Sequence, residues 1–208
     1  AEFLVSRGFN EMMSNSLISD RFVNESAVAD YASEENIQIV NPLSSDLNVL
    51  RQGLIFNGLE AIAYNQNRQH ADLSLFEFGN VYKKAGEGFA ENFRLALYLS
   101  GSTLPNNWRN PSTTYTFYDI KGEVMALLKR LGLAGKVKME ACESEVFEES
   151  VSYLLNNKTL VQVGWVNSTI HKQFGVREKV FFADFDWDAM LSALKPDQIS
   201  YQELSKFP

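Results

Sequence analysis

The spacing of apolar residues predicts a series of short strands separated by a few amphipathic helices. Residues 93–100 alternate apolar and polar side chains, which is typical of a strand with one buried face. Residues 71–83 carry apolar side chains on both faces around Leu75 to Phe78, so we expect a central strand covered on both sides. Further strands are expected at residues 136–142, 150–155, 159–166 and 180–185. Asn156-Asn157 is typical of a hairpin turn between two of them.

The clearest helix is marked by an apolar stripe at helical spacing from Ile120 to Leu131. Asp119 is placed to cap its start, and Gly132 to stop it. Shorter helices are expected over residues 20–29 and after Asp186, because an aspartate precedes or opens each of them. Residues 1–7 are interpreted as the last turns of a helix that Gly8 closes.

The region before the first long strand is also expected to be helical. Residues 37–40 predict a short strand that ends at the Asn41-Pro42 turn, where proline keeps Asn41 out of the helical region. Leu47, Leu50 and Leu54 then share one helical face, and the apolar pattern resumes at residue 59. The phase slip at Gly58 indicates a bend or two abutting helices, because glycine is costly in a helix interior.

These elements indicate an α+β domain with a largely antiparallel sheet. The 208 residues are enough for one large domain or two small ones, and no apolar run of about 18 residues predicts a membrane span. The net charge of −7 argues against a broad phosphate-binding surface. The one cysteine, Cys142, excludes an internal disulfide, and with His70 and His171 it leaves too few ligands for a typical zinc site. These features suit a cytoplasmic protein whose partner is another protein.

A longer motif adds to this description. The stretch from Asn41 to Tyr82 reads NPLSSDLNVLRQGLIFNGLEAIAYNQNRQHADLSLFEFGNVY. It closely resembles the core of the phenylalanyl-tRNA synthetase beta subunit family of bacteria, and the stretch from Trp108 to Leu131 resembles it as well. The resemblance implies a class II aminoacyl-tRNA synthetase-like antiparallel sheet flanked by helices over residues 1–200. It also implies that residues 201–208 begin a further ferredoxin-like anticodon-binding domain, so both ends of the chain are interpreted as cut.

The residues that class II synthetases use for catalysis are expected to be missing. Members of that class clamp the α-phosphate of ATP with an Arg-x-Glu signature at a strand end, whereas this chain has Lys83-Lys84-Ala85 there. Lysine lacks the bidentate fork of arginine. The Gly-rich third signature ending in Arg is also absent, and Gly164 to His171 lies roughly where the family places another turn. We therefore expect no catalytic residue, cofactor site or metal site in this chain.

The resemblance also implies partners. The beta subunit packs on an alpha subunit that bears the phenylalanine and ATP site, with ATP and magnesium expected for the whole complex and tRNA contacted weakly or not at all by this chain. Candidate contact elements are residues 9–18, 41–44 and 47–67. Two alternatives remain open: a stand-alone amino-acid-sensing module and an active ATP-dependent ligase.

Several polar residues are candidates for interface or structural roles. Arg51 either pairs with an acid at an interface or in the core, or lies on a solvated helix face. Glu77 lies mid-strand among apolar residues, so it is expected to be partly buried with an Arg, a Lys or backbone donors nearby. The remaining candidates of this group are Asn41, Pro42, Ser44, Asn65 and Gly79.

Other features have structural interpretations. Trp108 is expected to anchor its loop on the sheet, and Gly86-Glu87-Gly88 to form a hairpin loop. His70 and His171 are expected to be structural. A basic cluster could contact RNA weakly, although charges near a helix end more often complement its dipole; it comprises Lys121, Lys129, Arg130, Lys136 and Lys138.

Overall fold

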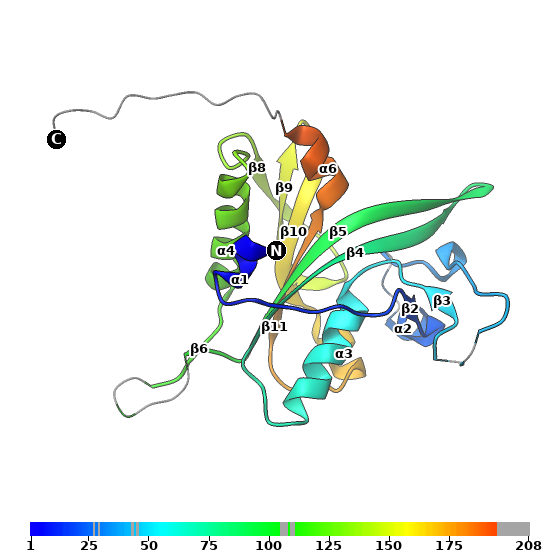
Figure 1. Ribbon diagram of the computed structural model, residues 1–208, viewed down its shortest axis with the longest axis horizontal. Helices are drawn as coiled ribbons and strands as arrows, with labels where there is room; N and C mark the ends of the chain where they lie inside the picture. The colour runs from blue at the N-terminus through cyan, green and yellow to red at the C-terminus, as the bar shows by residue number, and fades with distance from the viewer. Residues whose placement is uncertain are drawn as a thin grey trace.

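A seven-stranded sheet forms the centre of the molecule in the computed structural model (Figure 1). The structure describes residues 1–26, 28, 30–42, 44, 46–104, 108 and 111–194. The strand order is β1-β4-β5-β11-β10-β9-β8, with β1 parallel to β4 and every other neighbouring pair antiparallel. The strands are β1 (Asn10–Glu11), β4 (Leu73–Ala85), β5 (Gly88–Ser100), β8 (Lys138–Cys142), β9 (Phe147–Leu155), β10 (Lys158–Val166) and β11 (Val180–Asp186).

Helices cover both faces of this sheet. On one face lie α2 (Asp20–Ser26), α3 (Ile55–Gln66) and α5 (Ser168–Gln173), and on the other lie α1 (Glu2–Val5), α4 (Phe117–Arg130) and α6 (Trp187–Ala193). A short 3-10 helix, η1 (Ser33–Glu35), and two small sheets complete the described elements. The small sheets pair β2 (Leu17–Ile18) with β3 (Val49–Leu50) and β6 (Ser102–Leu104) with β7 (Thr113–Thr114). The α+β prediction is confirmed.

Coverage on both faces changes the description of β5. Its residues 95–100 are all buried, so the prediction of a strand with one solvent-exposed face is wrong over this half. Ala96 and Tyr98 point toward the core under α3, and Leu97 toward the core under α4. Successive side chains in this half of β5 therefore alternate between two buried cores, and not between a core and solvent. The expectation for β4 is confirmed for its apolar faces, although β4 lies next to the sheet edge rather than at the centre.

The helix predicted from Leu47 to Leu54 is wrong. Val49 and Leu50 form β3, and the helix begins at Ile55 and runs without interruption to Gln66. Gly58 lies inside this helix because α3 packs closely on β5: a Cβ at Gly58 would overlap the ring of Tyr98. The glycine therefore marks a close contact between helix and sheet, and not a bend or a helix boundary. The strand predicted at residues 37–40 is reduced to one isolated bridge between Gln38 and Val49.

Elements whose signals are local agree with the sequence. Gly132 follows the end of α4 with φ of 69°, as predicted, but the cap at the start is one turn earlier than expected: Thr116 is the N-cap, and Asp119, inside the helix, completes a capping box with it. Asn156 and Asn157 form the hairpin turn between β9 and β10 with φ of 51° and 64°. Asp186 caps α6 by accepting from the backbone N–H of Ala189.

The remaining predictions have mixed outcomes. Gly8, with φ of 90°, follows α1 as expected, and Asp20 opens α2, which ends at Ser26. Trp108 is exposed, so it does not anchor its loop on the sheet. The predicted domain start at residues 201–208 lies outside the described residues. Among the residues that are described, no helix is long and apolar enough to cross a membrane.

Candidate functional site

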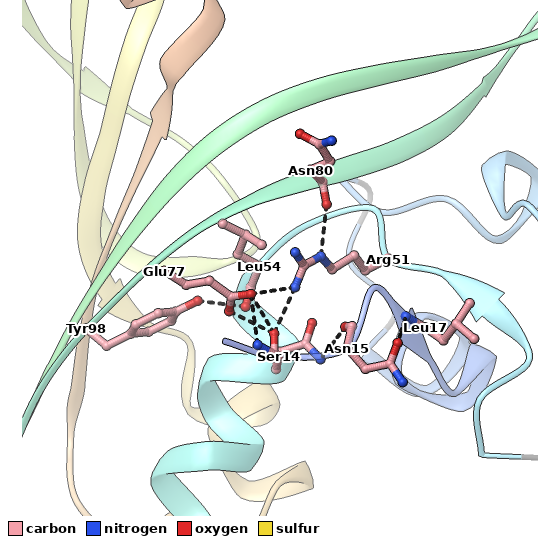
Figure 2. Close-up of polar contacts among 9 residues, drawn as sticks. Ser14, Asn15, Leu17, Arg51, Leu54, Glu77, Asn80 and Tyr98 are labelled. Carbon is pink, nitrogen blue, oxygen red and sulfur yellow. Dashed lines mark hydrogen bonds and ion pairs between the residues drawn. The ribbon is translucent and has the colours of Figure 1, made fainter. Parts of the chain in front are cut away.

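A buried ion pair between Arg51 and Glu77 joins the segment before α3 to the sheet (Figure 2). Arg51 Nη1 lies 2.8 Å from Glu77 Oε1, and the two side chains are 3% and 1% exposed. Glu77 lies on the face of β4 that also carries Leu75 and Val81, which belong to the core under α3. The expectation of a buried carboxylate with a cationic partner is confirmed. Of the two interpretations of Arg51, the core ion pair holds, and the solvated helix face is wrong.

Further hydrogen bonds complete this cluster. Ser14 donates its backbone N–H and its hydroxyl to Glu77 Oε1 at 3.2 and 2.7 Å, and Ser14 Oγ accepts from Arg51 Nη1 at 2.8 Å. Arg51 Nε donates to the carbonyl of Asn80 at 2.9 Å, and the backbone carbonyl of Arg51 accepts from the N–H of Tyr82 at 2.8 Å. The two charges are thus hydrogen-bonded as well as paired, which is the condition for burying them.

Gly79 makes room for this cluster. It lies two residues after Glu77 on the same face of β4, and a Cβ at this position would overlap Arg51 Nη2. The guanidinium therefore passes directly over the glycine backbone to reach Glu77. Three of the seven candidate polar residues, namely Arg51, Glu77 and Gly79, come together in one site.

The other candidates do not join it. Asn41, Pro42 and Ser44 lie exposed in the connection before β3, where Ser44 Oγ accepts from the backbone N–H of Asp46 at 3.2 Å. Asn65 lies near the end of α3 and donates to the carbonyl of Ala61 at 2.8 Å. Their interface roles stay predictions.

A second arginine–carboxylate pair lies on the same face of the sheet. Arg94 of β5 donates from Nε and Nη2 to the two carboxylate oxygens of Asp184 of β11, at 2.7 and 2.8 Å. These side chains are 23% and 12% exposed. Burial alone would lower the pKa of the Arg94 guanidinium, but the charge and hydrogen bonds of Asp184 together raise it above its ordinary value. In the described strands Arg94 is the one arginine, and its fork is already occupied.

Two adjoining cavities open beside this pair. One of about 160 Å³ is lined by Tyr31, Gln52 and Lys83 together with the pair, and another of about 240 Å³ includes Asp186. Lys83 donates to the carbonyl of Asp30 at 2.9 Å and pairs with Glu35 at 3.0 Å.

This arrangement does not fit a nucleotide's phosphates. Asp184 and Asp186 bring negative charge to the cavities, Arg94 is closed by a bidentate carboxylate, and Lys83 is engaged elsewhere. Across the described ranges no group of three or more His, Cys, Asp or Glu side chains is placed to hold a metal ion.

The remaining polar features are structural in their contacts. Lys129 and Arg130 lie in the last turn of α4, where cations complement the helix dipole, and Lys138 pairs with Glu140. The His171 ring contacts the carbonyl of Glu178. The structural interpretation is confirmed for His171.

Sequence reasoning missed Ser14, Tyr31 and Arg94. The polar Arg94 alternates with apolar neighbours, so it was indistinguishable from a residue on a solvated face. Its partner Asp184 is 90 residues away, and Ser14 is 63 residues from Glu77. The one available signal was that arginine and aspartate each interrupt a buried strand, which predicts a partner without identifying it.

The fold is that of class II aminoacyl-tRNA synthetases. A solved pyrrolysyl-tRNA synthetase from Desulfitobacterium hafniense superposes with a TM-score of 0.70 at 13% identity, over 96% of this chain and 71% of that one. Another structure of a pyrrolysyl-tRNA synthetase from the same organism gives a TM-score of 0.66 at 16% identity, over 91% and 64% of the two chains. Likeness at this level of identity establishes the fold alone.

Sequence comparison identifies the family within this class. The chain belongs to the family of the phenylalanyl-tRNA synthetase beta chain CLM domain, whose model matches residues 1–187. It is 36% identical to the phenylalanine–tRNA ligase beta subunit of Bacteroides thetaiotaomicron over all of its length. It is 32% identical to that of Fusobacterium nucleatum over 97% of its length. The chain spans about a quarter of each relative, 26% and 25% respectively.

Proposed function

We propose that this chain is a non-catalytic, synthetase-like core that holds the catalytic alpha subunit of a phenylalanine–tRNA ligase. The observation that carries the proposal is that both arginines on this face of the sheet are already paired with carboxylates. The chain in which they occur belongs to the beta-chain family. Arg94 is closed by Asp184, and Arg51 is buried against Glu77. Neither guanidinium is available to a phosphate, whereas both stabilise the folded domain. ATP, magnesium and phenylalanine then bind in the alpha subunit, and the complex works in the cytoplasm.

The buried ion pair also suggests how the domain presents a surface to its partner. Met12 donates its backbone N–H to the carbonyl of Phe76, and Ser14 is bonded to Glu77, so the chain is fixed on both sides of Met13. Met13 itself is 96% exposed. A methionine held rigidly in solvent is a suitable anchor for an apolar pocket on a partner, because little backbone entropy remains to be lost on binding. This residue lies within the contact element proposed at residues 9–18.

The first test measures binding of the alpha subunit from the same organism to this chain by calorimetry. Met13→Asp should weaken binding at least about tenfold, because a charge would have to be desolvated at the interface. The matched control is Met139→Asp, since Met139 is also an exposed methionine, at 47%, but lies on the edge strand β8. Equal binding of the two variants would contradict the docking role of residues 9–18.

The second test addresses catalysis directly. The chain alone should support no phenylalanine-dependent ATP–pyrophosphate exchange and should give no saturable heat with ATP. Exchange by the chain alone would establish the ATP-dependent ligase instead. Saturable heat with phenylalanine in the absence of the alpha subunit would favour the amino-acid-sensing module.

A further inference from the structure

Residues 30–36, here called the strap, lie beside the Arg94–Asp184 pair, and Asp30 and Tyr31 line the same cavity as the pair. Lys83, near the end of β4, donates to the carbonyl of Asp30 at 2.9 Å. Ser144, in the connection between β8 and β9, donates to the carboxylate of the same Asp30 at 2.7 Å. Both contacts are made by Asp30, so this one residue at the start of the strap joins it to β4 and to the connection between β8 and β9.

Tyr31 is the side chain that the strap inserts beneath itself. It is 8% exposed and its ring packs against that of Phe56, with centroids 5.1 Å apart. Gly53 leaves space for it, because a Cβ at Gly53 would lie 2.5 Å from the Tyr31 hydroxyl oxygen and 2.6 Å from its ring. The ring thus occupies a fitted position between α3 and the sheet.

The cavity of about 160 Å³ continues from this ring toward Arg94, Asp184 and Gln162. Burial, followed by the charge of Asp184, raises the pKa of the Tyr31 phenol, and Arg94 acts in the opposite direction. The hydroxyl therefore lies within the field of the ion pair. Removing the ring would join its volume to a cavity that already has a polar end.

The outer ion pair of the strap is weak. The Lys83–Glu35 pair is 3.0 Å long with side chains that are 38% and 42% exposed, and such surface pairs contribute little. On the inner side, Gln52 Nε2 donates to the carbonyl of Ala32 and to Asn36 Oδ1, both at 2.7 Å. The buried Tyr31 ring, this amide and the two hydrogen bonds of Asp30 hold the strap down.

We propose that Tyr31 is the resident occupant of a ligand pocket on this sheet, and that the pocket accepts a small phenol when the tyrosine ring is removed or displaced. The recognised chemistry is a planar aromatic ring, packed as Tyr31 is against Phe56, with a hydroxyl beside Gly53 in the cavity that Arg94 and Asp184 also line. In the native chain the pocket is closed to free aromatic amino acids.

The test uses Tyr31→Ala and phenol, because alanine keeps the Cβ and the deleted atoms are those of phenol. Phenol at ten times its Kd should raise the Tm of the variant by about 3–6 °C, and should leave the native chain unchanged. Toluene, which lacks the hydroxyl, should bind the variant more weakly than phenol. Tyr118→Ala is the matched control, since Tyr118 is exposed on α4 and its removal opens no cavity.

A second variant keeps the tyrosine and loosens the strap. Lys83→Ala combined with Ser144→Ala removes the outer contacts of Asp30 and should make phenol binding detectable by calorimetry with Tyr31 in place. Phenol binding to the native chain as tight as to Tyr31→Ala would overturn the proposal, as would absence of binding to both altered chains. If Tyr31→Ala does not fold, the double variant alone decides between these outcomes.

Discussion

The Arg51–Glu77 and Arg94–Asp184 pairs lie on one face of the sheet, in the same row of residues, but have different surroundings. Glu77 is in register with Ala96, and Ala96 with Asp184, so each carboxylate lies one strand away from the same alanine. Arg51 and Glu77 are 3% and 1% exposed, against 23% and 12% for Arg94 and Asp184. The first pair is enclosed by backbone and Ser14, whereas the second opens on two cavities.

This difference indicates what each pair does. A buried pair whose charges are also hydrogen-bonded stabilises one arrangement of the chain and costs several kcal/mol to break from one side. A partly exposed bidentate pair is screened by solvent, so breaking it costs much less. We therefore assign the Arg51–Glu77 pair to holding residues 12–14 on β4, whereas the Arg94–Asp184 pair joins β5 to β11 beside the two cavities.

The largest expected loss of stability comes from breaking the Arg51–Glu77 pair. Glu77→Ala leaves Arg51 buried without its counter-ion and should lower the free energy of unfolding by about 3–5 kcal/mol. Urea unfolding measures this loss. The double variant Arg51→Met/Glu77→Leu should recover most of it, because an apolar pair of similar size carries no uncompensated charge. A loss below about 1 kcal/mol for Glu77→Ala would remove the distinction between the pairs.

Gly79→Ala tests the space over which Arg51 passes. The added methyl would overlap the guanidinium, so we expect a loss of about 1–3 kcal/mol in the free energy of unfolding. Gly122→Ala is the control, because Gly122 lies in α4 and a Cβ added there would meet no atom within 4 Å. Alanine at that position should raise the free energy of unfolding by about 0.5–1 kcal/mol. Changes of opposite sign in the free energy of unfolding for the two substitutions would support close packing at Gly79. Changes of the same sign would argue against it.

Asp184→Ala should cost less than Glu77→Ala. The Arg94 side chain remains accessible to water once its partner is removed, so we expect a loss of about 1–2 kcal/mol. The same variant frees the guanidinium fork, and weak binding of pyrophosphate, measured by calorimetry, should appear in the variant and not in the native chain. A loss as large as that for Glu77→Ala would show that partial exposure does not weaken this pair.

An exposed carboxylate gives the smallest effect and completes the series. Hydrogen bonds from Trp165 and then from Ser168 lower the pKa of Glu148. Its contribution is therefore present above the unfolded-state pKa and is lost as the pH falls through the lower folded-state pKa. Glu148→Gln should reduce stability by less than about 0.5 kcal/mol at pH 7, with the difference disappearing at acid pH in urea titrations. A difference that persists under acid conditions would exclude this ionisation as its cause.

The parts of the fold that were predicted correctly depend on neighbours in the sequence. The cap of α6 by Asp186 and the Asn156-Asn157 turn each involve residues no more than three positions apart. By contrast, Leu47, Leu50 and Leu54 match a helical face and still lie in a loop, a strand and the residue before α3. There the pairing of β3 with β2, more than 30 residues earlier, overrides the local apolar spacing.

The candidate site shows the same limit. The burial of Glu77 and its need for a cation followed from its apolar neighbours, but the identity of that cation did not, since Arg51 is 26 residues away. Arg94 and Asp184 were not paired at all in the sequence interpretation, because each interrupts a different strand. The sequence likewise did not predict that Gly58 and Gly79 are places where another side chain comes close to the backbone.

The sequence by itself determined most strands of the main sheet, the cap of α6, the turn between β9 and β10 and the family, because these depend on short-range hydrogen bonds, side-chain period and shared motifs. The tertiary structure decided which charges are buried together, which glycines have a neighbour above them, and that Tyr31 covers the sheet. The physical reason is that a buried charge or ring is stabilised by whatever the fold brings next to it. That neighbour is set by sheet register and helix packing over long stretches of chain, and not by adjacent residues.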